Sequence, residues 1–198
     1  YVHPKMYIYL QPDFASSAGS TGHIAQLRDW YVDAGIDADN EFRFRIGQSK
    51  VPYSFENMQS SQNRLPLDRA DPTNSSNSNE RDLGVFFYWA PKRIRERFKM
   101  LVDEGLKGSG DYGVLALGAY NGQTANRPEA NDEPHVVARL SYPFAFNGQI
   151  IEPSVAHYSG KYVITSDLHR RGLQALHRAH YDTARLFGGG CLSPRPFG

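Results

Sequence analysis

Short segments in which apolar and polar side chains alternate recur along most of this chain and limit what it can fold into. In the clearest of them, Phe42, Phe44 and Ile46 alternate with Arg43 and Arg45. Successive side chains of a β-strand point to opposite faces of its sheet. This segment is therefore predicted to be a strand with one apolar face and one cationic face.

Seven or so alternating segments predict an all-β, antiparallel chain. They cover residues 5–14, 26–37, 41–50, 81–89, 111–121, 135–144 and 149–165, and the last reads as one or two strands. Residues 91–105 instead space their apolar side chains as an amphipathic helix does. Strands of about ten residues can cross a bilayer at a tilt, whereas no apolar run approaches the ~20 residues of a membrane helix.

The connections between these segments differ in length in a regular way. Long polar loops follow the first, third and fifth segments, short turns follow the second and sixth, and the helix follows the fourth. Long loops at one end and short turns at the other are typical of outer-membrane β-barrels. A soluble antiparallel sandwich or barrel that binds a small anion or a sugar fits the alternation too and is the alternative.

The parity of the alternation predicts one continuous apolar face that points outward, toward lipid. The residues expected on it are Met6, Ile8, Leu10, Trp30, Val32, Phe44 and Val85. Asp29, Arg43 and Arg45 have the opposite parity and are expected inside.

Composition excludes several classes of function. The net charge of +1 argues against nucleic-acid binding, which needs a strongly basic surface. Cys191 is the only cysteine and the histidines lack the spacing of metal ligands, so neither a cofactor nor a metal is expected. Asp29 and Asp33 lie on one face of a strand, but a polar wall explains them more simply than catalysis, and no enzyme is expected.

Residues 51–80 interrupt the alternation with a long polar loop. It carries Ser60, Ser61 and Arg69 within a stretch rich in amide and hydroxyl groups. A guanidinium binds an oxyanion through two parallel hydrogen bonds, and serine hydroxyls add neutral donors. The loop is therefore a candidate anion site.

The stretch RIGQSKVPYSFENMQSSQNRLPLDR, with LRDWYVDAG before it and ERDLGVFFYW after it, resembles the phosphate-selective porins (O/P type) of Gram-negative outer membranes. The likeness runs from about residue 5 to residue 165 and includes YGVLALGAYNGQTANRPEANDEPHVVARLSYPF. It implies a trimeric transmembrane β-barrel of roughly 16–18 strands. This chain supplies fewer than half of them, so we expect a fragment of a longer outer-membrane channel for passive uptake of anions, phosphate or polyphosphate.

The resemblance also implies which residues form the anion site, in a loop that folds into the barrel as its constriction. Ser60, Ser61 and Arg69 match the two serines and the central arginine of the family, and Asp29 matches its acidic residue. Asn57 stands where the phosphate-specific member has lysine. This departure predicts weaker and less discriminating phosphate binding.

Three cations of the third strand, Arg43, Arg45 and Lys50, are expected to line the approach to this site. Folding of residues 51–69 toward the strands should bring Ser60, Ser61 and Arg69 close to Asp29.

The last part of the chain differs from residues 1–165, which we interpret as the partial barrel. Residues 166–198 lose the alternation and become basic and rich in histidine. A reading-frame error near Ser166 is the interpretation we favour, and a divergent end is the alternative. No function is assigned to this tail.

Overall fold

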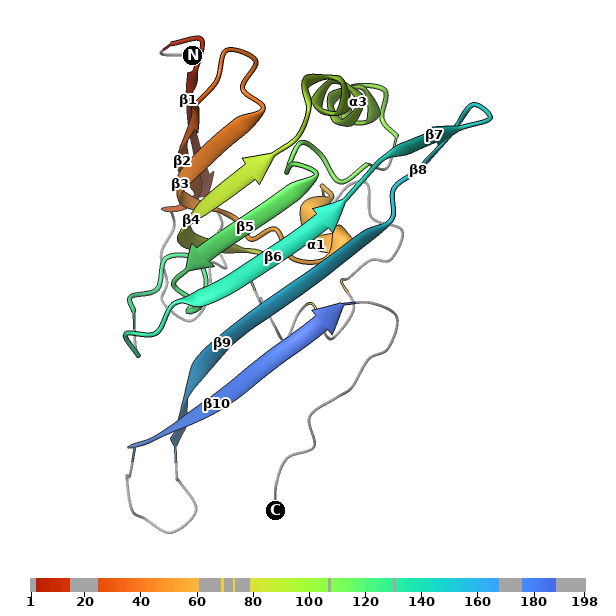
Figure 1. Cartoon of the computed structure of the whole chain (residues 1–198). Helices are drawn as coiled ribbons and strands as arrows, with labels where there is room; N and C mark the ends of the chain where they lie inside the picture. Colours follow the sequence, from red (N-terminus) through yellow and green to blue (C-terminus); the bar gives the residue numbers. More distant parts are fainter. Residues whose placement is uncertain are drawn as a thin grey trace.

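The structure is a computed structural model that describes residues 3–14, 25–60, 69, 73, 79–106, 108–129, 131–167 and 176–187, with side chains up to residue 161. Its main element is one sheet in which every strand pairs antiparallel with the next along the chain. The strands are β1 (Met6–Phe14), β2 (Ala25–Gly35), β3 (Phe42–Lys50), β4 (Arg81–Trp89), β5 (Leu115–Tyr120), β6 (His135–Ser141), β9 (Ser154–Asp167) and β10 (Leu176–Phe187). β1 and β10 are the edges, so the chain forms an open part of a barrel (Figure 1). The expected antiparallel all-β fold is confirmed.

Three segments differ from the expected elements. β5 begins only at Leu115, and the preceding residues 108–114 form an irregular connection. Residues 144–151 form a separate small hairpin, β7 (Phe144–Phe146) with β8 (Gln149–Ile151). β10 lies in the tail that lacked alternation, where it pairs with β9. The boundary at residue 165 and the frame error stay predictions.

The outward apolar face is confirmed. Ile8, Val32, Ile46, Val85 and Val136 belong to one row that crosses the sheet from β1 to β6, with Ala119 completing it on β5. Of the residues expected outside, Val32 is half-buried and the others are exposed: Met6, Ile8, Leu10, Trp30, Phe44 and Val85. Asp29, Arg43 and Arg45 are buried on the opposite, inner face.

The helix α3 (Lys92–Asp103) covers one end of the sheet, which we call the turn end. Its buried Ile94 and Phe98 pack against Ala90 and Val114 at the ends of β4 and β5. The helix lies at the same end as the β7–β8 hairpin (Figure 1). The amphipathic helix expected after the fourth strand is thereby confirmed. In the described part of the chain, no helix has the length and apolar character needed to cross a membrane.

The turn between β2 and β3 is held by the carboxylate of Asp37. Its oxygens accept hydrogen bonds from the backbone N–H groups of Asp39 (3.1 Å), Glu41 (3.1 Å) and Phe42 (2.9 Å). These bonds favour the charged form, and that from Phe42 contributes most to lowering the pKa of Asp37.

We expect Asp37→Ala to lower the denaturant midpoint of the folded protein at neutral pH, because three turn amides lose their acceptor. The stabilisation is present above the unfolded pKa of an aspartate, about 3.9, and is lost as pH falls through the lower folded pKa. Guanidinium unfolding of wild type and variant in lipid vesicles measures this difference, which should shrink in acid. A difference that grew as pH fell would contradict it.

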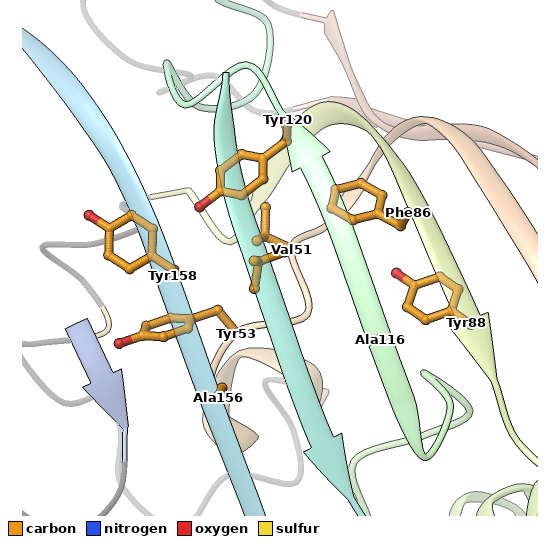
Figure 2. Packing of buried hydrophobic residues seen from close by; sticks show 9 residues of the cluster. Val51, Tyr53, Phe86, Tyr88, Ala116, Tyr120, Ala156 and Tyr158 are labelled. Atoms are coloured by element: carbon orange, nitrogen blue, oxygen red, sulfur yellow. The ribbon is translucent and has the colours of Figure 1, made fainter. Parts of the chain in front are cut away.

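The start of the polar loop folds onto the inner face of the sheet. Residues 51–60, which we call the inward loop, contain the short helix α1 (Phe55–Met58). Val51 and Tyr53 pack into a buried cluster with side chains of β4, β5, β6 and β9, and Tyr53 meets Tyr158 edge-on at a ring distance of 5.2 Å (Figure 2). The loop thus covers the β4–β9 half of the inner face.

Candidate functional site

A cavity of about 690 Å³ lies along the inner face of β1, β2 and β3. Its other walls are the inward loop at Met58 and Ser60, the pair Glu80 and Arg81, and residues 108–112 of the connection between α3 and β5. The cavity exists because the loop packs against the opposite half of the inner face, which leaves the polar face of β1–β3 uncovered.

The two arginines of β3 reach this cavity, and each meets a carboxylate. Arg45 donates from Nε and Nη2 to the two carboxylate oxygens of Asp33 at 2.8 and 2.7 Å. Asp33 is the residue directly opposite Arg45 on β2. Arg43 donates from Nη2 to Asp111 Oδ1 at 2.8 Å. Such pairing fixes the guanidinium planes and reduces the positive field that the arginines project.

Five charged side chains meet where the inward loop leaves and rejoins the sheet. We call Asp29, Lys50, Arg69, Glu80 and Arg81 the loop-base cluster. Glu80 is its centre: Arg81 Nη1 donates to it at 3.0 Å, and Arg69 Nε and Lys50 Nζ each lie 3.7 Å from one of its oxygens. Arg81 Nε also donates to Asp29 Oδ2 at 2.9 Å. Among these five described residues, three cations face two carboxylates, so the cluster as defined carries one net positive charge.

Asn57, which lies in α1 of the inward loop, connects the loop to this cluster through its side-chain amide. Its side chain is fully buried. The amide Nδ2 donates to the carbonyl oxygens of Val51 (2.8 Å) and Glu80 (3.2 Å), and Oδ1 accepts from Arg69 Nη1 at 3.0 Å. A lysine at this position would bring a second cation against Arg69, whereas asparagine satisfies both loop carbonyls and the guanidinium.

The structure brings most of the expected site residues to one cavity. Those that line it are Asp29, Arg43, Arg45, Lys50 and Ser60. Arg69 and Asn57 are buried next to each other, and Arg69 is linked to Asp29 through Glu80 and Arg81. Ser61 lies outside the described residues. The role of these residues in anion binding stays a prediction.

Sequence reasoning missed three residues of the site. Glu80 and Arg81 stand side by side where alternation resumes, and this charged pair at a loop end was the signal that could have found them. Asp111 was assigned to a strand, but it lies in the irregular connection and joins Arg43 of β3 to Arg95 of α3, whose Nε donates to it at 2.9 Å. Asp29 and Asp33, considered as a catalytic pair, each bind an arginine instead.

A second buried cluster holds the same connection in place. Arg139 of β6 donates from Nη2 to Ser109 Oγ (3.0 Å) and to Glu152 Oε1 (3.3 Å). Glu152 also accepts from Ser109 and from Ser141. Anchored through Ser109 and Asp111, residues 108–112 form the wall of the cavity at the turn end.

In the anion channel that the resemblance to porins implies, we expect Asp111→Ala to increase anion selectivity. The substitution removes one negative charge from the cavity wall and leaves Arg43, whose side chain is only 9% exposed, without the carboxylate that offsets it. Reversal potentials in a salt gradient should move toward the anion. Asp103→Ala, which removes an exposed carboxylate of α3, is the control. Equal shifts in both variants would contradict a specific role for Asp111.

Comparison with known proteins gave one result. The family model described as phosphate-selective porin O and P matches residues 5–178. Neither a curated protein nor a solved structure matches the chain.

Proposed function

The chain belongs to the phosphate-selective porin O and P family, and we propose that the complete protein is an outer-membrane channel for passive uptake of anions, phosphate or polyphosphate among them. The observation that carries this proposal is the loop-base cluster, whose single net positive charge stands where the inward loop meets the strand wall. A conducting site must attract its ion and also release it. A cluster of paired charges with one excess cation suits both needs.

The distribution of charge supports an anion channel of moderate selectivity. Arg43 and Arg45 face the cavity, but Asp111 and Asp33 offset their charges. Since Asn57 is neutral, the cations that the described residues place at the base of the inward loop are Lys50, Arg69 and Arg81. We therefore propose that phosphate binds weakly at the loop-base cluster, with Ser60 and Ser61 as neutral donors, and that Arg43, Arg45 and Lys50 line its path.

The arrangement of the sheet faces favours a channel over the soluble alternative. A soluble sandwich buries its apolar faces between two sheets. Here the apolar rows of the outer face are exposed, and the inner face carries the charged residues of β2 and β3 beside the apolar cluster under the inward loop. We propose that lipid covers much of this outer face, and that the complete barrel assembles as a homotrimer, as the resemblance to porins implies.

The test is the current through the complete porin in planar bilayers. We expect reversal potentials that favour chloride over potassium, and a chloride current that falls as inorganic phosphate is added. Cation selectivity, or a current that phosphate leaves unchanged, would contradict the proposal. A protein that stays soluble and folded without detergent would favour the soluble alternative.

A further inference from the structure

We propose that the cavity binds phosphate esters of polyhydroxylated molecules, such as sugar phosphates, more tightly than bare phosphate. The proposal rests on the phosphate channel proposed above, and it names the solute class of that same cavity. The carrying feature is a patch of three half-buried tyrosines, Tyr7, Tyr9 and Tyr31, which we call the tyrosine shelf.

The shelf is a continuous aromatic surface on the inner face of β1 and β2. Tyr9 and Tyr31 are direct partners across the two strands, and their rings stack at a centroid distance of 5.3 Å and an angle of 29°. The ring centroid of Tyr7 lies 6.1 Å from that of Tyr9 and 6.5 Å from that of Tyr31. All three line the cavity, whose wall also includes Asp29, Lys50 and Ser60.

The ring faces of the shelf, as distinct from the hydroxyl groups at their tips, offer a bare oxyanion no favourable contact. The face of an aromatic ring carries negative potential, so it attracts C–H groups and cations rather than phosphate oxygens. Arg45 shows this preference, since its guanidinium carbon lies 4.0 Å from the centre of the Tyr31 ring. The C–H face of a sugar ring would gain from Tyr7 and Tyr9 in the same way.

The side chains around the shelf offer hydrogen-bond partners for the hydroxyl groups of a sugar. The pairs Arg45–Asp33 and Arg43–Asp111 place fixed donors and acceptors on the same wall with little net charge. Gln11, whose Oε1 accepts from Tyr9, adds an amide. Pockets that hold small organic molecules combine apolar walls with a few placed polar groups, and typically measure about 300–1,000 Å³. The cavity of about 690 Å³ lies within this range.

The shelf and the loop-base cluster are close enough for one solute. Asp29 and Tyr31 lie two residues apart on the same strand, a separation of about 7 Å. A phosphate group at the loop-base cluster can therefore carry a single sugar ring onto the shelf.

The experiment compares two blockers of equal charge in the complete porin. Chloride current in planar bilayers is titrated with inorganic phosphate and with glucose 6-phosphate at pH 9, where both are predominantly dianionic, because the second pKa lies near 6 for a phosphate ester and about one unit higher for inorganic phosphate. In the wild type we expect half-block by glucose 6-phosphate at a concentration about fivefold lower. Equal half-blocking concentrations in the wild type would overturn the proposal without any variant.

Variants then separate the shelf from the cluster. The double variant Tyr7→Leu, Tyr9→Leu should raise the half-blocking concentration of glucose 6-phosphate about tenfold. Each ring contact contributes roughly a two- to tenfold change in binding affinity. Inorganic phosphate should shift by less than about twofold. Tyr7→Phe with Tyr9→Phe keeps the rings and should retain the preference. If the half-blocking concentrations of both blockers shifted equally in the leucine variant, the role of the shelf would be overturned and the phosphate channel would remain. If glucose 6-phosphate blocked the current and inorganic phosphate did not, the shelf would be supported and the phosphate channel overturned.

Discussion

In the complete porin, Arg69→Ala is expected to weaken phosphate block of the chloride current about tenfold and to reduce anion preference. Without Arg69 the loop-base cluster has two cations and two carboxylates, so its net positive charge disappears. At an effective dielectric of about 20, a unit charge about 6 Å from an anion contributes roughly 3 kcal/mol. Channel water screens part of this energy, which leaves about one decade in affinity.

Two controls separate charge from structure in this experiment. Arg69→Lys keeps the cation but loses the planar fork that meets Asn57 and Glu80, so we expect selectivity to survive and phosphate affinity to fall only in part. Arg28→Ala removes a cation that lines the same cavity but pairs with Asp13. Phosphate titration of the chloride current measures the phosphate affinity of the three variants, and reversal potentials measure their anion preference. If Arg69→Ala behaved as wild type, or no differently from Arg28→Ala, the cluster would not be the selectivity element.

Tyr53→Ala is expected to release the inward loop and raise single-channel conductance, with loss of phosphate block. Tyr53 is 1% exposed and packs against Tyr158, so its truncation leaves a cavity in the contact that holds the loop to β9. Large aromatic-to-alanine changes in a core cost about 3–5 kcal/mol. That is comparable to the local stability of many loops, so the loop would spend much of its time away from the sheet.

Tyr53→Phe is the matched control, because it keeps the ring and its packing. We expect its conductance and its phosphate block to remain close to those of the wild type. Single-channel recordings distinguish the two variants directly. Wild-type conductance and block in Tyr53→Ala would show that the packing of Val51 and the hydrogen bonds of Asn57 hold the loop without this ring.

The sequence by itself determined most of the strands up to β9 and the direction of their faces. Alternation is a local property, because neighbouring side chains of a strand must point to opposite sides. It was therefore sufficient to place Ile8, Ile46 and Val85 outside and Arg43 and Arg45 inside. The change to helical spacing after Trp89 marked α3 for the same reason. Recurring motifs of one family then indicated the inward loop and several residues of the cavity.

Only the tertiary structure decided how the charges of the site are paired. Whether Arg45 meets Asp33 depends on the register between β2 and β3, and Asp111 reaches Arg43 across 68 residues of sequence. Asn57 could be read from sequence as a missing cation, yet its buried amide is what joins the loop carbonyls to Arg69. Such contacts follow from how distant segments pack on one face of the sheet, and the local pattern of residues carries no record of that packing.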